Sequence, residues 1–436
     1  MEIKDLYKLF LQHPTITTDS RDVPEGAIFF SLKGETFNGN AYAKAALEKG
    51  AAYAVIDEKE YAEESNDRLL LVDNVLETLQ QLARYHREQL GTPIIGITGT
   101  NGKTTTKELI ATVLKQKYNV LYTQGNFNNH IGVPKTLLQL TPEHQMAVIE
   151  MGANHPGEIK TLVNIVRPNY GIITNVGKAH LLGFGSFEGV IRTKGELYDF
   201  LRETEGTVFI NNDNPHLKGI SNGLKLIKYG QTDANDLLVK GKLVECNPFL
   251  KLEWETAKPT KTGGTIQTQL IGSYNLDNAL AAACIGTYFQ VPATDICAAL
   301  EAYTPSNNRS QLTLTPHNRL VVDAYNANPT SMKAALDNFQ LINADHKMCI
   351  LGQMGELGDV SEEEHQKVID LLGGCGFETV WLVGDNFAQT AHPAHYRLFA
   401  NVEEVKAAIA TEKPQGFLIL IKGSNSNHLV QLVEKL

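Results

Sequence analysis

The stretch Gly99-Thr100-Asn101-Gly102-Lys103-Thr104-Thr105 follows an apolar run that ends at Ile97 and precedes a helical pattern from Thr106 onward. Its glycines allow backbone N–H groups to turn inward around phosphate oxygens, and the N-terminus of the helix adds a favourable dipole. Lys103 is then placed to reach the β- and γ-phosphates of a nucleotide, and the Thr104 hydroxyl to ligate Mg²⁺. The full phosphate-loop pattern has Gly where this chain has Ile97, but the strand–loop–helix context is the required one. The sequence therefore predicts a nucleotide-binding loop rather than a structural glycine-rich turn.

Apolar runs and helical patterns alternate between residues 75 and 304, around the phosphate-binding stretch. The runs at 146–149 and 171–173 are apolar without interruption, which is typical of parallel strands covered by helices on both faces. A β-rich segment at 237–271 breaks the alternation and is expected to form an accessory hairpin or small sheet. We therefore predict a central domain over 75–304 with a parallel sheet of the P-loop ATPase type.

Two further α/β domains are expected, one on each side of the central domain. Residues 1–74 contain short apolar strands and a glycine-rich loop, and apolar residues at helical spacing then follow as far as Gly91. Residues 305–436 repeat a strand and a helical segment, which favours a doubly wound, Rossmann-like sheet. Its strands are expected at 320–322, 348–351, 380–383 and 417–421. The predicted fold class is α/β, with three domains.

The composition excludes several classes of protein. Lys and Arg number 39 against 49 Asp and Glu in 436 residues, a net charge of −10, so no basic surface is expected for a nucleic acid or an anionic membrane. The 5 cysteines show neither the spacing of a zinc site nor the pattern of a disulfide framework. Charged residues near Met1 and the lack of a long apolar run predict neither a signal peptide nor a membrane span. We expect a cytoplasmic protein.

Three further residues have side chains suited to metal binding or catalysis. Glu150 follows the run at 146–149, where a carboxylate is placed to hold a Mg²⁺ ion that bridges nucleotide phosphates. His180 lies soon after the run at 171–173, and Lys194 lies further along the chain. From spacing alone, a lone histidine such as His180 is usually structural, and Lys194 is an ordinary surface lysine.

Four segments together resemble the Mur ligase family of ATP-dependent amide-forming enzymes, namely Gly99–Thr105, Glu150, Thr174–His180 and Lys194-Gly195-Glu196. The resemblance implies that ATP is the nucleotide and that Lys103, His180 and Lys194 are catalytic. It also implies that Lys194 is carbamylated, which turns a cation into a carboxylate-like Mg²⁺ ligand beside His180. Two Mg²⁺ ions are then expected, one held by Thr104 and Glu150 and the other by His180 and Lys194.

The resemblance extends over the whole chain through four more stretches, which are Thr18-Asp19-Ser20-Arg21, Gly125–Pro134, Asp323–Pro329 and Leu351–Gly358. They are similar to the branch of the family that joins D-alanyl-D-alanine to UDP-N-acetylmuramoyl-tripeptide through an acyl phosphate, in the last cytoplasmic step of peptidoglycan precursor synthesis. The resemblance implies that residues 1–74 bind the UDP-linked substrate and that 305–436 close on ATP and the incoming dipeptide. The acidic composition predicts no nucleic-acid or membrane partner, and we expect a monomer.

Residue by residue, the resemblance assigns two sets of ligand contacts. The nucleotide set comprises Gly99, Thr100, Asn101, Gly102, Lys103, Thr104, Thr105, Asn275, Asn278, Arg309 and Asp323. The substrate set comprises Ser20, Arg21, Asn128, Asn129, Tyr325 and Asn326. Structural alternatives exist: helix capping for Asn275 and Asn278, an Asn-rich turn at 126–129, a surface arginine for Arg309 and a strand-end aspartate for Asp323.

Three positions depart from the family pattern. Tyr274 stands where the family often has His, Asn308 where Gly is usual, and Asn425 where Arg is expected. The change at Asn425 lies where contacts to the incoming dipeptide are expected.

Three rival functions stay open. Folylpolyglutamate synthase carries out the same class of reaction but lacks a UDP-type domain such as residues 1–74. A second rival is the family member that adds the third residue of the peptide, against which the stretch Asp323–Pro329 argues. From a different class, a nucleotide-gated binding protein would need neither of the two metal sites.

Overall fold

The computed structural model describes residues 1–63, 65–256, 261–306 and 308–436. The chain forms two compact units, each assembled from separate stretches of sequence. The first comprises residues 1–97, 118–153 and 157–171, and the second 98–117, 154–156 and 172–436. Within the described residues, every helix is too short or too polar to cross a lipid bilayer. The domain boundaries expected at residues 74 and 304 stay predictions.

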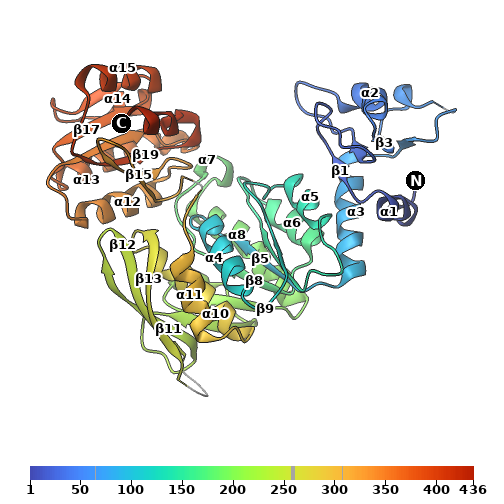
Figure 1. Cartoon of the computed structure of the whole chain (residues 1–436), viewed down its shortest axis with the longest axis horizontal. Helices are drawn as coiled ribbons and strands as arrows, with labels where there is room; N and C mark the ends of the chain where they lie inside the picture. Colours follow the sequence, from blue (N-terminus) through green and yellow to red (C-terminus); the bar gives the residue numbers. More distant parts are fainter. Residues whose placement is uncertain (64, 257–260, 307) are drawn as a thin grey trace. The chain divides into compact units, whose positions relative to one another are not determined.

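The N-terminal part of the first unit is a four-stranded parallel sheet in the order β1-β2-β3-β4. It is drawn in blue in Figure 1. Its strands are β1 (Ile16–Thr17), β2 (Ile28–Phe30), β3 (Tyr53–Ile56) and β4 (Leu69–Leu71). The helix α2 (Ala43–Glu48) buries Ala46 in one core with Phe29 and Ile56. This small α/β sheet confirms the fold expected for the start of the chain.

A long helix, α3 (Val75–Leu90), follows this sheet in the first unit. It begins after Asn74, whose side chain accepts a hydrogen bond from the Glu77 N–H at 2.9 Å. It ends as expected at Gly91, which takes a left-handed conformation with φ of 66° that costs glycine nothing sterically. The helix packs against α1 (Ile3–Gln12), α5 (Gly132–Leu137) and α6 (Glu158–Val166).

The strands of the first unit beside these helices pair in parallel in the order β5-β7-β6. They are β5 (Ile94–Thr98), β7 (Met146–Glu150) and β6 (Val120–Tyr122). All residues of β5 and β7 are buried, which confirms the strands expected from their uninterrupted apolar runs.

The helix of the phosphate loop, α4 (Lys103–Leu114), belongs to the second unit. It begins at Lys103, so the helical start expected at Thr106 is wrong. Gly102 takes a left-handed conformation with φ of 76° at the N-cap position, and the turn from loop to helix is therefore complete before Lys103. The helix packs against α10 (Asn275–Tyr288) and α11 (Ala293–Ala302).

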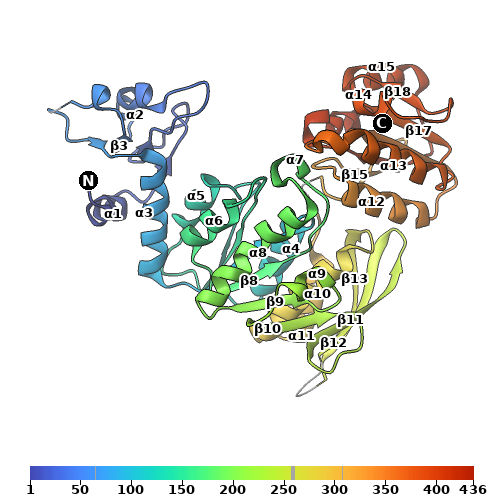
Figure 2. The same ribbon diagram turned by 180° about the vertical axis from the view of Figure 1, so that it is seen from behind.

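In the second unit, the sheet that contains β8 to β13 changes from parallel to antiparallel pairing (Figures 1 and 2). After β8 (Tyr170–Ile173) come, in order, β9 (Thr207–Asn211), β10 (Lys225–Gly230), β11 (Leu237–Cys246), β12 (Phe249–Thr256) and β13 (Gly263–Ile271). β9, β10 and β11 pair in parallel, whereas β11, β12 and β13 pair antiparallel. The segment 237–271 therefore extends the main sheet and is not a separate hairpin. The helices α7 (Leu181–Phe184), α8 (Phe187–Glu203) and α9 (Pro215–Gly219) lie between these strands in sequence.

The C-terminal part of the second unit is a six-stranded sheet in the order β14-β15-β19-β16-β17-β18. Its strands are β14 (Gln311–Leu314), β15 (Arg319–Asp323), β16 (Lys347–Gly352), β17 (Thr379–Val383), β18 (Arg397–Phe399) and β19 (Leu418–Lys422). All pairs are parallel except that of β14 with β15.

Helices cover both faces of this C-terminal sheet (Figure 2). α12 (Pro329–Leu341) and α13 (Ser361–Gly373) contribute to the core on one face, and α15 (Val402–Glu412) contributes to the core on the other. The expected doubly wound, Rossmann-like fold is confirmed. The four expected strands are the central ones, and the sequence analysis missed the two short edge strands β14 and β18.

Candidate active site

The phosphate loop lies between β5 and the N-terminus of α4. Gly99 has a φ of 143°, and a Cβ there would collide with the Thr174 hydroxyl, so the loop requires glycine at this position. The amine of Lys103 donates hydrogen bonds to the carbonyl oxygens of Gly99 at 2.8 Å and Thr100 at 3.1 Å. The lysine thus lies along the loop, at the positive end of the α4 dipole.

The segment after β8 holds the loop in this conformation. The Thr100 N–H donates to the Asn175 carbonyl at 2.9 Å, and the Asn101 N–H donates to the Asn175 side-chain oxygen at 3.0 Å. The Thr174 hydroxyl donates to the Asn101 carbonyl at 2.6 Å. The Thr100 hydroxyl accepts from the Gly177 N–H at 3.0 Å. The loop is therefore braced by hydrogen bonds from the segment that follows β8.

Asn275 and Asn278 lie on α10 next to the phosphate loop. The Asn278 amide donates to the Asn275 side-chain oxygen at 2.8 Å and accepts from the Thr106 hydroxyl at 2.9 Å. A Cβ on Gly102 would lie 2.8 Å from the Asn278 oxygen, so the loop packs directly on this side chain. Neither residue caps α10, because Tyr274 holds the N-cap position, and the capping alternative is therefore wrong.

His180 and Lys194 lie in the same neighbourhood as Lys103. Burial lowers the pKa of His180 below 6.5, the positive charges of Lys103 and Lys194 lower it further, and the Glu356 carboxylate that contacts its Nδ1 opposes them. Lys194, on α8, is 2% exposed, and its amine lies 5.1 Å from the centre of the Phe184 ring. The surface-lysine alternative for Lys194 is therefore wrong.

Glu150 ends β7 in the first unit, with 1% of its surface exposed. One of its carboxylate oxygens accepts a hydrogen bond from the Asn128 amide at 2.9 Å. The Asn129 side-chain oxygen instead accepts from the backbone N–H groups of Ile131 at 3.1 Å and Gly132 at 2.8 Å. Within the Asn-rich loop, Asn128 therefore supports Glu150, whereas Asn129 stabilises a local turn.

Ser20 and Arg21 lie in a turn of the first unit before β2. The guanidinium of Arg21 is exposed and pairs with Asp19 at 2.7 Å, and this pairing holds the pKa of the Asp19 carboxyl well below its usual range. The Ser20 carbonyl accepts from the Lys49 amine at 2.6 Å. Lys135, on α5, donates to the Thr18 hydroxyl at 3.5 Å. The roles of Ser20 and Arg21 in substrate binding stay predictions.

Arg309, Asp323, Tyr325 and Asn326 lie close together in the C-terminal part. The Arg309 guanidinium stacks on the Tyr325 ring, 3.7 Å from its centre, and so is not a loose surface arginine. Asp323 ends β15 and accepts a hydrogen bond at 2.6 Å from the buried Lys422, which also donates to the Asn326 carbonyl at 3.4 Å. Fixed partners thus hold Arg309 and Asp323, the two residues here that are expected to contact the nucleotide.

The three departures from the family pattern have local explanations. The Tyr274 hydroxyl contacts the hydroxyl of Ser310. Asn308 has a φ of 56°, in the left-handed region that Asn tolerates better than most residues other than Gly. The Asn425 N–H donates to the Tyr325 carbonyl at 3.0 Å, so its backbone supports the loop after β15.

Glu356 is a site residue that the sequence analysis missed, although it lies in the quoted stretch Leu351–Gly358. Its carboxylate contacts His180, and its carbonyl accepts from the Leu182 N–H at 3.2 Å. No local pattern marks such a pair, because the partners lie 176 residues apart in sequence.

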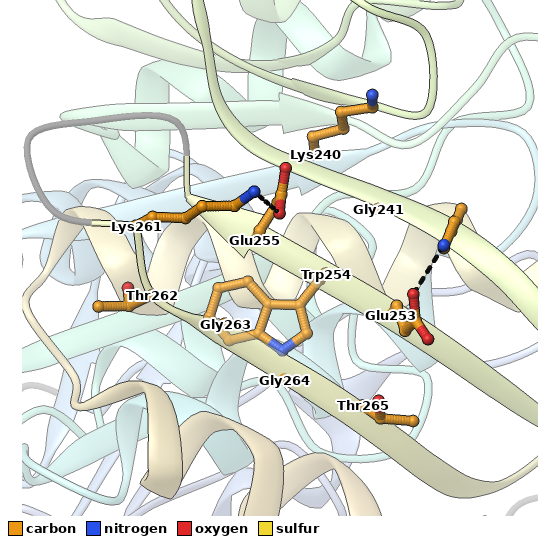
Figure 3. A pocket seen from close by; sticks show the side chains of 11 residues that line it. Lys240, Gly241, Glu253, Trp254, Glu255, Lys261, Thr262, Gly263, Gly264 and Thr265 are labelled. Atoms are coloured by element: carbon orange, nitrogen blue, oxygen red, sulfur yellow. Dashed lines mark ion pairs between the residues drawn. The ribbon is translucent and has the colours of Figure 1, made fainter.

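A cavity of about 440 Å³ lies on the antiparallel part of the sheet, between β11, β12 and β13 (Figure 3). Lysines and glutamates that line it form ion pairs, Lys242 of β11 with Glu253 of β12 at 2.8 Å and Lys261, before β13, with Glu255 at 2.7 Å. None of its lining residues belongs to the expected nucleotide, metal or substrate sets. The cavity is separate from the candidate active site.

The residues expected to hold Mg²⁺ are not all suitable ligands for that ion. In the described part of the chain, no three His, Cys, Asp or Glu side chains gather as a metal site. Mg²⁺ does not require this, because one or two carboxylates usually bind it together with phosphate oxygens and water. The Thr104 hydroxyl and the Glu150 carboxylate are suitable oxygen donors. His180 and a cationic Lys194 are not, and they fit a second ion only if Lys194 carries a carboxylate.

Three family models match the chain in succession. They are described as Mur ligase family, catalytic domain, at residues 14–87; Mur ligase middle domain, at residues 97–286; and Mur ligase, glutamate ligase domain, at residues 308–425. The chain is also 34% identical over 430 residues to the UDP-N-acetylmuramoyl-tripeptide–D-alanyl-D-alanine ligase of Bacillus subtilis (strain 168), covering 97% of this chain and 92% of that protein.

Solved structures of similar proteins share the fold over nearly the whole chain. A crystal structure of MurF from Acinetobacter baumannii has a TM-score of 0.86 and 30% identity, covering 97% of this chain and 93% of that one. A crystal structure of MurF ligase from Thermotoga maritima in complex with ADP has a TM-score of 0.85 and 25% identity, covering 98% of this chain and 97% of that one.

The loop that carries Glu356 is anchored by His365, a fully buried side chain on α13. Its Nε2 accepts from the Met354 N–H at 2.9 Å, and its Nδ1 donates to the Ser361 carbonyl at 2.7 Å. The bond from Met354 requires the neutral ring, because a protonated Nε2 cannot accept a hydrogen bond. Burial lowers the pKa of His365 below 6.5.

The buried His365 predicts that the protein loses stability in mild acid. Below pH 6.5 the unfolded chain binds a proton at this residue and the folded chain does not, so the free energy of unfolding falls as the pH falls. The substitution His365→Gln removes the titrating group and keeps an acceptor for the Met354 N–H. Urea midpoints at about pH 7.5 and about pH 5.5 should therefore differ less in the variant than in the natural protein. Equal differences would contradict this role of His365.

Proposed function

Because the chain belongs to the Mur ligase family, we propose that it joins D-alanyl-D-alanine to UDP-N-acetylmuramoyl-tripeptide at the expense of ATP, as an enzyme of peptidoglycan precursor synthesis. One observation carries the proposal: Lys103, His180 and Lys194 lie together beside a braced phosphate loop. A protein that only binds a nucleotide needs no such group of side chains. The monomeric state and cytoplasmic location stay predictions.

The first chemical step is transfer of the γ-phosphoryl group of ATP to the tripeptide. The free carboxylate of the tripeptide attacks the γ-phosphorus, the bond to the β,γ-bridging oxygen breaks, and ADP leaves. Lys103 and the N–H groups of the loop neutralise the charge on the transferred group, which is the main catalytic task in this class of reaction. Because the loop is already braced by Thr174 and Asn175, these donors need little rearrangement when the phosphates bind.

The second step forms the amide bond. The amine of D-alanyl-D-alanine attacks the carbonyl carbon of the acyl phosphate, inorganic phosphate leaves, and the nitrogen loses a proton. Acyl phosphates hydrolyse readily, so the site must exclude water while the intermediate exists. Residues 305–436 provide the closing surface, since Asp323, Arg309 and Glu356 all lie on this part and Glu356 contacts His180.

Thr104 with Glu150, and His180 with a carbamylated Lys194, would hold two Mg²⁺ ions, which supply neutralisation of phosphate charge when bound. Carbamylation adds CO₂ to the neutral Lys194 amine and releases a proton, which leaves a carboxylate on the side chain. A cationic Lys194 next to His180 and Lys103 would repel a metal ion, whereas the carbamate would attract one. This local excess of positive charge is the argument for the proposed modification of Lys194.

The proposed substrates predict a specific pattern of phosphate release. The purified protein with ATP and UDP-N-acetylmuramoyl-tripeptide should release phosphate with D-alanyl-D-alanine and much less with single amino acids. Lys103→Ala should abolish release, whereas the matched exposed variant Lys242→Ala should retain it, because Lys242 pairs with Glu253 at the rim of the separate cavity. Release with glutamate and a folate alone would favour folylpolyglutamate synthase and reject the proposal.

The proposed carbamate on Lys194 predicts that an added carboxylic acid restores activity to the variant Lys194→Ala. Lys194→Ala should reduce the ligation rate by at least about a hundredfold, because the second Mg²⁺ loses its anionic ligand. A short-chain carboxylic acid added to the assay should restore part of the rate to this variant and none to Lys103→Ala. Full activity of Lys194→Ala without added acid would show that no carbamate is needed.

A further inference from the structure

Within the second unit, the segment after β8 contacts the C-terminal part at several points. The Lys178 amine pairs with the buried Glu364 carboxylate at 3.2 Å, and His180 contacts Glu356. Thr330, in the first turn of α12, accepts from the Lys178 N–H at 3.2 Å. These contacts bring the start of α12 against the same segment that braces the phosphate loop.

One contact reaches the phosphate loop itself. The Asn328 amide donates to the Asn101 side-chain oxygen at 2.8 Å, and the Asn101 amide points back to the Asn328 oxygen at 3.5 Å. The two residues are 227 positions apart in sequence, one in the loop and the other immediately before α12. The pair is therefore a direct link between the loop and the C-terminal part.

Both members of this amide pair are held in place by other bonds. Asn101 is fixed through its backbone by Thr174 and Asn175. Asn328 is 4% exposed and caps α12, since its side-chain oxygen accepts from the Ser331 N–H at 2.9 Å and its own N–H donates to the Ser331 hydroxyl at 3.1 Å. The pair forms only if the loop has its braced conformation and α12 lies against it.

Gly177 and Thr330 pack closely together beside the pair of Asn101 and Asn328. A Cβ on Gly177 would lie 2.9 Å from the Thr330 hydroxyl, so a side chain there would push α12 away. The amides of Asn101 and Asn328 are neutral, which avoids placing a negative charge next to the phosphates that the loop binds. An aspartate could cap α12 equally well but would bring such a charge.

From this geometry we infer that Asn328 is a positioning residue, which couples closure of the C-terminal part to the conformation of the phosphate loop. This inference rests on the proposed function, because closure serves to protect the acyl phosphate. Asn328 contacts Asn101 rather than the reacting atoms. Its loss weakens the closed state and leaves nucleotide binding to the loop almost unchanged.

The substitution Asn328→Ser separates this role from helix capping. Serine caps helices about as well as asparagine but is too short to reach Asn101. Asn401→Ser is the matched control, since Asn401 caps α15 through the N–H groups of Glu403 and Glu404 and makes no contact with the loop. We expect kcat to fall about three- to tenfold in Asn328→Ser only, as for loss of one hydrogen bond. The Kd of ADP should stay within about twofold of the natural value.

Hydrogen exchange provides a readout that needs no ligated product. The Lys178 and Leu182 N–H groups donate to Thr330 and Glu356, so exchange of a peptide covering 176–184 reports closure. ADP should protect this peptide in the natural protein and in Asn401→Ser, and less in Asn328→Ser. Because this readout is independent of the acceptor substrate, a failed ligation assay would reject the proposed function without deciding the role of Asn328.

A double-variant cycle completes the test. If Asn101 and Asn328 act as a pair, Asn101→Ser combined with Asn328→Ser should lower closure no more than Asn101→Ser alone. Additive losses would overturn the inference, as would natural protection from exchange in Asn328→Ser. An equal fall in kcat in Asn328→Ser and Asn401→Ser would also overturn the inference. Asn328 would then act only as a helix cap.

Discussion

The hydrogen bonds between the phosphate loop and the segment after β8 are the constraint on which the rest of the site depends. Thr174, Asn175 and Gly177 bind the backbone and hydroxyl groups of Thr100 and Asn101, and they fix the loop from one side. The same segment then continues to Lys178 and His180, which contact the C-terminal part. One short stretch of chain therefore sets the conformation of the loop and carries the residues that contact the C-terminal part.

The positive charge available for phosphate binding lies in a small region near the phosphate loop. The chain carries a net charge of −10, yet ATP and a UDP-linked substrate are themselves polyanions. Favourable charge comes from a small region, where Lys103 lies at the N-terminus of α4 and Lys194 and His180 lie close by. Because these groups are partly or fully buried, water and salt screen them less than surface charges. The overall acidity therefore does not prevent phosphate binding at the loop.

Features that depend on local sequence were predicted well. The end of α3 at Gly91 and the buried strands β5 and β7 follow from periodicity and from the conformational freedom of glycine. The edge strands β14 and β18 were missed because they are short and only partly buried, so they lack a strong apolar run. Pairs such as Asn101 with Asn328 could not be predicted, since they join residues 227 positions apart. Asn328 precedes Pro329, which marks a helix start but gives no sign of its partner.

The central claim is that the phosphate loop transfers a phosphoryl group to the tripeptide carboxylate. Isotope transfer tests it most directly: the free carboxylate of UDP-N-acetylmuramoyl-tripeptide is labelled with ¹⁸O, and the phosphate released with ATP and D-alanyl-D-alanine is examined by mass spectrometry. The account predicts one labelled oxygen in each phosphate, because the acyl phosphate breaks between carbon and oxygen. Phosphate without label, formed along with the ligated product, would contradict the acyl-phosphate route.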